Sequence, residues 1–244
     1  MERNIKIDCI TLKKLQLGEN NIGVSLLTSD NEVLFVMAFG AMKPKSKLFS
    51  GVNPFVEASW DLYYDPVKEY YRAKEVVVNN FNQEIQLSLE SYYTASLFLE
   101  IILKSQGSDG VYPILKQCLY YLSKGENSKT VLIQFLLRVF LEQGLLPSFN
   151  SCSNCYTQIE KESLFYPGDY ELHCCRCNSS RKALELNPGI LRYCINTPTL
   201  DFNKALRIGL GQDSLELLKK YLLELIKNYT GGKLLTLNSS NGLI

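Results

Sequence analysis

Residues 22–39 read IGVSLLTSDNEVLFVMAF, two apolar runs on either side of the turn sequence Ser29-Asp30-Asn31-Glu32. Runs of roughly four to eight apolar and β-branched residues bounded by turn residues are typical of β-strands. We therefore predict strands over residues 22–28 and 33–39, and the N-terminal part of the chain is expected to be built from strands.

Further strand signals lie on both sides of this pair. Residues 5–9 alternate apolar and polar side chains, and residues 55–64 and 71–78 carry two more strand-like runs. Residues 40–54 contain Pro44, Gly51 and Pro54 and are expected to form a long irregular connection. Five short strands suit a small closed barrel, because closure removes unpaired strand edges, and the OB-fold is the commonest five-stranded solution.

After residue 81 the apolar period becomes helical. Helices are expected over 92–104 with Ser91 as N-cap, over 111–123, and over 129–143 with Ser128 as N-cap. Two more helices are expected to begin at Pro188, after the cap residue Asn187, and at Asp213, and the tail from 230 to 244 is expected to be loose.

These patterns predict an α+β protein with two domains. Residues 1–80 are predicted to form a five-stranded OB-fold β-barrel that binds nucleic acid. Residues 81–244 are predicted to form a helical domain that carries a four-cysteine zinc finger as an insertion at about 149–178.

The insertion contains two Cys-x-x-Cys knuckles, Cys152-Ser153-Asn154-Cys155 and Cys174-Cys175-Arg176-Cys177. Each knuckle brings two sulfurs to one ion, and two knuckles complete a tetrahedron with Zn–S distances near ~2.3 Å. Cys152, Cys155, Cys174 and Cys177 are therefore the predicted ligands of one structural zinc ion. His173 or Cys175 in place of Cys174, thiols without a metal, and a redox dithiol remain alternatives.

Net charge, apolar segments and cysteine content limit the kinds of protein that this sequence can encode. The formal net charge is +1 over 244 residues, so any basic surface must come from clustering. No segment reads as a secretory signal or as a membrane span of about 18 apolar residues, and a cytoplasmic location is expected. Thiols are reduced in that compartment, which favours metal over disulfide, while Cys9, Cys118 and Cys194 are expected to be core residues.

A lysine loop follows the second of the two opening strands. Gly40-Ala41-Met42-Lys43-Pro44-Lys45-Ser46-Lys47 places three lysines in five residues, which would bind phosphates by charge. Lys13 and Lys14 are expected to extend the same face, and a solvated loop without a ligand is the alternative. The aromatic residues available for base stacking are each expected to lie in the core instead: Phe35, Phe39, Phe49, Phe55 and Tyr63.

Catalytic motifs are missing from the sequence. It has a single histidine, His173, and no phosphate-binding loop, nucleophile elbow or paired-carboxylate motif. We therefore expect a protein that is not an enzyme.

The order of these motifs resembles the bacterial recombination mediator RecO family over residues 5 to about 195. The resemblance includes the entry to the zinc module, where Phe135-Leu136-Leu137-Arg138 and Leu141-Glu142-Gln143-Gly144-Leu145-Leu146-Pro147 precede Cys152. In the N-terminal part it rests on Ile10-Thr11-Leu12-Lys13-Lys14, Leu17-Gly18-Glu19-Asn20-Asn21, Val24-Ser25-Leu26-Leu27-Thr28, Gly40-Ala41, Pro44-Lys45-Ser46-Lys47-Leu48 and Pro54-Phe55.

The resemblance implies a DNA repair and homologous recombination mediator of the RecF pathway. Such a protein binds single- and double-stranded DNA, anneals complementary strands and acts with RecR to load RecA on strands coated by single-strand-binding protein. It implies that Lys43, Lys45 and Lys47 belong to a DNA-binding loop and that the four knuckle cysteines hold zinc. It also implies a pocket in the helical domain for the C-terminal tail of single-strand-binding protein, and a bacterial, nucleoid-associated location.

Two other classes of function remain as alternatives to the recombination-mediator hypothesis. The near-neutral charge fits a zinc-stabilised interaction adaptor with little affinity for DNA. A thiol oxidoreductase that uses Cys174 and Cys177 is the third hypothesis.

Overall fold

The computed structural model describes residues 3–159, 161–166, 171–177 and 183–244. Its backbone contacts divide the chain into two compact units, Met1–Gly125 with Leu235–Ile244, and Glu126–Leu234. The chain therefore passes between the units twice. The domain boundary expected between residues 80 and 81 stays a prediction. None of the helices described is both long and apolar enough to cross a bilayer.

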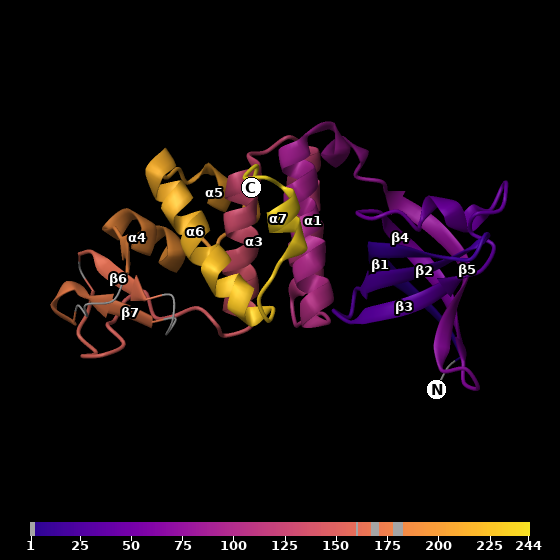
Figure 1. Cartoon of the computed structure of the whole chain (residues 1–244), viewed down its shortest axis with the longest axis horizontal. Coiled ribbons are helices and arrows are strands. Elements are labelled where there is room, and N and C mark those ends of the chain that lie inside the picture. The colour runs from indigo at the N-terminus through magenta and orange to yellow at the C-terminus, as the bar shows by residue number, and fades with distance from the viewer. Residues whose placement is uncertain (1–2, 160, 167–170, 178–182) are drawn as a thin grey trace. The chain divides into compact units, whose positions relative to one another are not determined.

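The first unit contains a closed five-stranded barrel, drawn in indigo and violet in Figure 1. Its strand order is β1-β2-β3-β5-β4, with β4 pairing back to β1, and only the β3–β5 pair is parallel. This closed five-stranded arrangement confirms the predicted OB-fold. The strands are β1 (Asn4–Leu17), β2 (Asn21–Thr28), β3 (Val33–Ala38), β4 (Glu57–Asp65) and β5 (Tyr70–Asn80).

Strand β1 is much longer than the predicted segment 5–9. Its first half pairs with β4 and its second half with β2, with a register shift between Thr11 and Lys13. A bulge of this kind bends a strand, so β1 can serve two neighbours and close the barrel. The second half was missed because Lys13, Lys14 and Gln16 are exposed, which leaves little apolar signal there.

The connection between β3 and β4 closes one end of the barrel. It contains the 3₁₀ helix η1 (Lys47–Ser50), which buries Leu48, and Val52 follows in the core. A Cβ on Gly51 would lie 2.6 Å from Val76 Cγ2 and 3.0 Å from Trp60 Cζ2. Because Trp60 is fully buried, the chain can pass this close to it only with a glycine.

Helices complete the first unit. Helix α1 begins three residues before the predicted segment, because Ser88 and not Ser91 accepts the capping hydrogen bond. The tail is not loose throughout: the backbone N–H groups of Leu235 and Thr236 donate to the Glu100 carboxylate at 2.7 and 2.8 Å, beside α1. The elements are η2 (Gln83–Leu87), α1 (Leu89–Ser105), α2 (Val111–Ser123) and α7 (Leu235–Ser239).

The second unit packs a small sheet against helices. Its central helix α3 is buried along most of its length, and Gln134 donates to Tyr193 Oη and Thr197 Oγ1, both at 2.9 Å. Three short strands form a sheet of order β7-β6-β8. The elements are α3 (Ser128–Glu142), β6 (Ser163–Tyr166), β7 (Glu171–Cys174), η3 (Cys175–Cys177), β8 (Leu184–Leu186), α4 (Pro188–Asn196), α5 (Phe202–Arg207) and α6 (Gln212–Tyr229).

In this unit the predicted start is confirmed for α4 and is shifted by one residue for α3 and α6. Asn187 caps α4 as expected, with Pro188 in the first turn. The cap of α3 is Asn127, one residue before the predicted Ser128, and α6 begins at Gln212 after Gly211, which places Asp213 in the first turn instead of at the start. Boundaries of this kind shift easily, since several polar residues near each start can act as the cap.

Replacing Asn187 with alanine should lower the free energy of unfolding by about 1 kcal/mol. The Asn187 side chain accepts from Ile190 N–H at 3.0 Å and donates to Ser214 Oγ at 3.0 Å, so it both caps α4 and holds it to α6. Urea denaturation measures the change. Asn196→Ala, in the last turn of the same helix and exposed, is the control and should change stability by less than ~0.5 kcal/mol. Equal losses in the two variants would contradict the capping role.

Candidate functional site

The structure brings four cysteine sulfurs together. The Sγ atoms of Cys152, Cys155, Cys174 and Cys177 all lie within 4.8 Å of one another, and those of Cys155 and Cys174 are 3.7 Å apart. A tetrahedron with metal–sulfur bonds of ~2.3 Å has sulfur–sulfur edges of ~3.8 Å. Four thiols at this spacing could hold one metal ion.

Both knuckles are held by backbone hydrogen bonds. Cys152 N–H donates to Thr157 O at 3.0 Å, and Tyr156 N–H donates to Cys152 O at 2.9 Å, which closes the first turn. Tyr156 takes a positive φ of 58°, a conformation in which glycine is more usual. The second knuckle begins at the last residue of β7. Ser153 N–H of the first knuckle donates to Leu172 O of β7 at 2.9 Å, and this hydrogen bond joins the two knuckles.

Hydrogen bonds within the cluster shift the pKa values of Cys155 and Cys177 in opposite directions. A hydrogen bond from Thr157, whose Oγ1 lies 2.9 Å from Cys155 Sγ, lowers the pKa of Cys155 to about 6. Hydrogen bonding with Cys155 raises the pKa of Cys177 to about 12. The thiolate is the form that binds a metal, and the site favours it first at Cys155.

The two alternative ligands lie outside this group. His173 is buried, and its Nε2 lies 3.0 Å from Glu171 Oε2. Cys175 is exposed, and its Sγ points to the carbonyl of Glu162 at 3.1 Å. The remaining cysteines, Cys9, Cys118 and Cys194, are fully or almost fully buried, which confirms the expectation that they are core residues.

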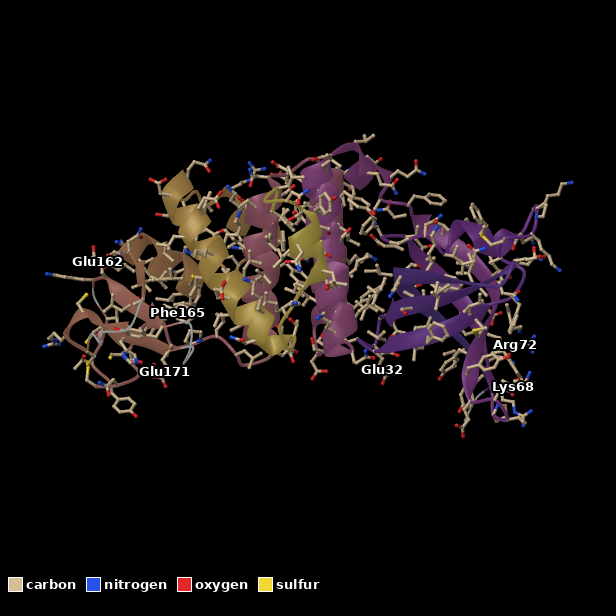
Figure 2. The ribbon with its side chains drawn as sticks, in the orientation of Figure 1. Glu32, Lys68, Arg72, Glu162, Phe165 and Glu171 are labelled. Atoms are coloured by element: carbon tan, nitrogen blue, oxygen red, sulfur yellow. The ribbon has the colours of Figure 1, made fainter. Side chains whose placement is uncertain are left out.

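The cysteine module, by which we mean both knuckles with the sheet β7-β6-β8, packs against helix α6 of the second unit. Phe165 of β6 (Figure 2) packs edge-on against Tyr221 of α6, with ring centroids 4.4 Å apart. Phe149, just before the first knuckle, also contacts Tyr221. Phe165 and Tyr221 are fully buried, so the shape of the module and the position of α6 depend on each other.

The lysine loop lies beside the β1–β2 turn of the barrel. Gly40 N–H donates to Asn21 Oδ1 at 2.9 Å, and Met42 N–H donates to Asn20 O at 3.1 Å. The side chains of Lys43, Lys45 and Lys47 are all exposed. Among the described residues, Lys47 is the one lysine of the three with a carboxylate nearby, that of Glu75 at 4.0 Å. Both side chains are mostly exposed, so this pair neutralises little of the loop's positive charge.

Three aromatic residues of β3 and of the β3–β4 connection are exposed, contrary to expectation. Phe35, Phe39 and Phe49 are 47%, 39% and 48% exposed, so the prediction that they lie in the core is wrong. Strand β3 turns Val36 and Ala38 into the barrel and therefore turns Phe35 outward, and the exposed Phe39 follows the last residue of the strand. Of the five aromatic residues considered, only Phe55 is buried in the core, at 3% exposure, while Tyr63 is half-buried.

A cation lies over one of these rings. The Arg72 guanidinium of β5 is 5.1 Å from the centroid of the Phe39 ring, and Tyr70 lies 6.3 Å from the same centroid. Arg72 and Lys68 both belong to the end of the β4–β5 hairpin (Figure 2), and both are exposed. Phe39, Tyr70 and Arg72, which we call the stacking platform, thus stand next to the start of the lysine loop.

Lys13 and Lys14 do not lie on one face. Lys13 pairs with Ser25, which pairs with Phe35, so Lys13 lies on the outer face of the barrel with that ring. The next residue of a strand points to the opposite face. Lys14 accordingly reaches the β3–β4 connection, where its Nζ donates to Asn53 Oδ1 at 2.8 Å.

The stacking platform was missed in the sequence for a physical reason. In VLFVMAF every residue is apolar, so the alternation that separates inner from outer positions is absent. The sequence did not indicate Arg72 and Tyr70 as part of a site either, because they contact Phe39 only through the parallel pairing of β3 with β5. Once the strand order is known, the start of β5 is placed beside the end of β3, and Arg72 and Tyr70 come close to Phe39.

Comparison with known proteins matches both parts of the chain. The family model described as recombination protein O N terminal matches residues 1–81, and that described as recombination protein O C terminal matches residues 86–238. The DNA repair protein RecO of Oceanobacillus iheyensis is 22% identical over 229 residues, covering 93% of this chain and 88% of that protein. That of Caldanaerobacter subterraneus subsp. tengcongensis is 25% identical over 233 residues, covering 93% of each. The barrel, the helices and the two family models together establish that this chain belongs to the RecO family of DNA repair proteins.

Proposed function

We propose that this protein is a DNA repair and recombination mediator that binds single- and double-stranded DNA and anneals complementary strands without catalysing a reaction. The observation that carries the proposal is the stacking platform beside the lysine loop. Surface rings stack with successive bases of a single strand, arginine side chains beside them add cation–π contacts, and lysines bind the phosphates. Neutralised phosphates allow two strands to approach each other, and this step requires no nucleophile.

The cysteine module has a structural role in this proposal. We assign the metal as one zinc ion held by Cys152, Cys155, Cys174 and Cys177, because four thiolates in two knuckles are typical of structural zinc sites. Such a site is closed, so the ion would stabilise the fold of the second unit. It would leave no coordination position for a substrate.

Partners follow from the family. We propose that the protein acts with RecR to load RecA onto strands coated by single-strand-binding protein. The C-terminal tail of that protein would bind the helical domain. Work on chromosomal DNA would place the protein in the bacterial cytoplasm, at the nucleoid.

Replacing Phe39 with alanine should weaken binding of single-stranded DNA about tenfold, since stacking of one base on an aromatic ring contributes ~1–3 kcal/mol. Fluorescence anisotropy with a labelled oligothymidine measures the affinity. Phe49→Ala removes a ring of similar exposure that has no described cation over it, and should leave the affinity unchanged. Phe39→Tyr should keep most of the affinity. Equal weakening by Phe39→Ala and Phe49→Ala would contradict the role of the platform.

A further inference from the structure

A cavity opens in the first unit, at the opposite end of β5 from the stacking platform. Its volume is about 510 Å³, within the range of ~300–1,000 Å³ of small-ligand sites. It lies where the β3–β4 connection, the end of β5 and the start of α1 meet, and Lys14 reaches it from the strand face opposite to Lys13. Its lining includes none of residues 40–47, so the lysine loop does not form its wall.

Three aromatic rings line this cavity. Phe55 forms a buried wall, with its ring 5.7 Å from that of Tyr92 in an edge-to-face arrangement. Phe81 and Tyr92 are 45% and 41% exposed, so both side chains are accessible to a ligand in the cavity. A flat apolar ligand of the size of a nucleobase would be held between such rings.

The backbone holds Phe55 in a strained conformation. Its φ is +72°, which is unusual for a bulky residue. The strain is maintained from both sides: Phe55 N–H donates to Thr11 O at 3.0 Å, and its carbonyl accepts from Asn82 Nδ2 at 2.9 Å. Asn82 is itself held by the buried carboxylate of Glu57, at 3.1 Å. Strain that the surroundings maintain in this way is common at ligand sites.

Side chains that could bind the edge of a base and its phosphate surround the rings. Gln83 and Gln86 line the cavity, and within the described residues their amides have no hydrogen-bond partner. Each amide offers both donors and acceptors, as the edge of a base requires. Lys14 adds one positive charge at the rim, suited to the phosphate that accompanies a base.

We propose that this cavity, the base pocket, binds one unstacked nucleobase of a single strand between Phe81 and Tyr92, with Gln83 and Gln86 on the base edge and Lys14 on the adjoining phosphate. The inference rests on the proposed binding of single strands. It adds a second point of attachment, separate from the stacking platform, at which a single base and its phosphate are held together. A strand held at both sites would expose the bases between them for pairing.

The test compares two labelled strands of equal length and charge, an oligothymidine and a strand in which every base is replaced by an abasic sugar. The wild-type protein should prefer the oligothymidine, and Phe81→Ala combined with Tyr92→Ala should reduce this preference about tenfold. Affinity for the abasic strand should not change. Gln86→Ala should lower the preference less, and Tyr92→Phe should keep it. Leu87→Ala, an exposed residue of η2 outside the cavity, is the matched control.

Location is tested separately by photocrosslinking with 5-iodouracil in the strand, followed by mass spectrometry of the peptides. Crosslinks at Phe81 or Tyr92, competed by adenosine monophosphate, support the pocket. If both strands bind but the double variant keeps the full preference, the pocket is wrong while the proposed function stands. If neither strand binds the wild-type protein, the proposed function fails too. Competition by a peptide ending in a phenylalanine carboxylate, but not by the nucleotide, would assign the pocket to a protein and overturn the inference.

Discussion

Replacing Cys152 with serine should abolish metal binding and unfold the cysteine module, the largest effect expected of any single substitution in this chain. Binding of a structural zinc ion by four thiolates contributes an apparent ~10–16 kcal/mol at neutral pH in zinc-finger peptides, which exceeds what a three-stranded sheet of this size supplies alone. Metal content, measured by elemental analysis, should fall from one zinc per chain to near zero. Chelation of the wild-type protein should have the same result.

Unfolding of the cysteine module should also destabilise the helices that pack against it. Phe165 in the sheet and Tyr221 on α6 are both fully buried against each other, so the unfolded module would leave the Tyr221 side of α6 exposed. Loss of near-ultraviolet circular dichroism and a lower unfolding temperature would report this change. Far-ultraviolet signal from the barrel should be retained.

Cys175→Ser is the matched control for this prediction. Cys175 is adjacent to a proposed ligand, but its thiol points to the Glu162 carbonyl instead of to the other four sulfurs. This variant should keep both the metal and the unfolding temperature. Full zinc content in Cys152→Ser, or loss of zinc in Cys175→Ser, would contradict the assigned ligand set.

The fold was predictable where local sequence decides structure. The strands β2 and β3, the helix α2 and the cap Asn187 follow from apolar runs, helical period and cap chemistry. The two knuckles were predictable as a group because i, i+3 cysteines have few other arrangements. By contrast, the second half of β1 carries exposed lysines and is a strand only because β2 pairs with it.

The candidate sites were predictable only in part for the same reason. The lysine loop is contiguous, so its charge could be seen in the sequence. The stacking platform joins Phe39 to Arg72 across a parallel pair, and the base pocket joins Phe55 to Tyr92 across the end of the barrel. Such contacts depend on barrel closure and on strand parity, and neither is contained in a local pattern.

Replacing Lys43, Lys45 and Lys47 together with alanine should weaken binding of single-stranded DNA about 100-fold at ~0.1 M salt. Each lysine–phosphate contact on a single strand adds about 0.7 to the slope of log affinity against log salt concentration, so three contacts add about two. Between ~1 M and ~0.1 M salt this slope corresponds to two decades of affinity. The exposed pair of Lys47 with Glu75 is too weak to cancel its share.

The salt slope distinguishes this mechanism from the alternatives, because only lost phosphate contacts change it. The triple alanine variant should have a slope smaller by about two, and annealing of complementary strands should slow with the affinity. Replacing the same three lysines with arginine keeps the charge and should preserve both the slope and annealing. An interaction adaptor with little affinity for DNA would lose nothing in the alanine variant, so unchanged affinity and slope would refute the lysine loop as the DNA contact. Weaker binding with an unchanged slope would instead mean that the loop supports the platform beside it without touching phosphate.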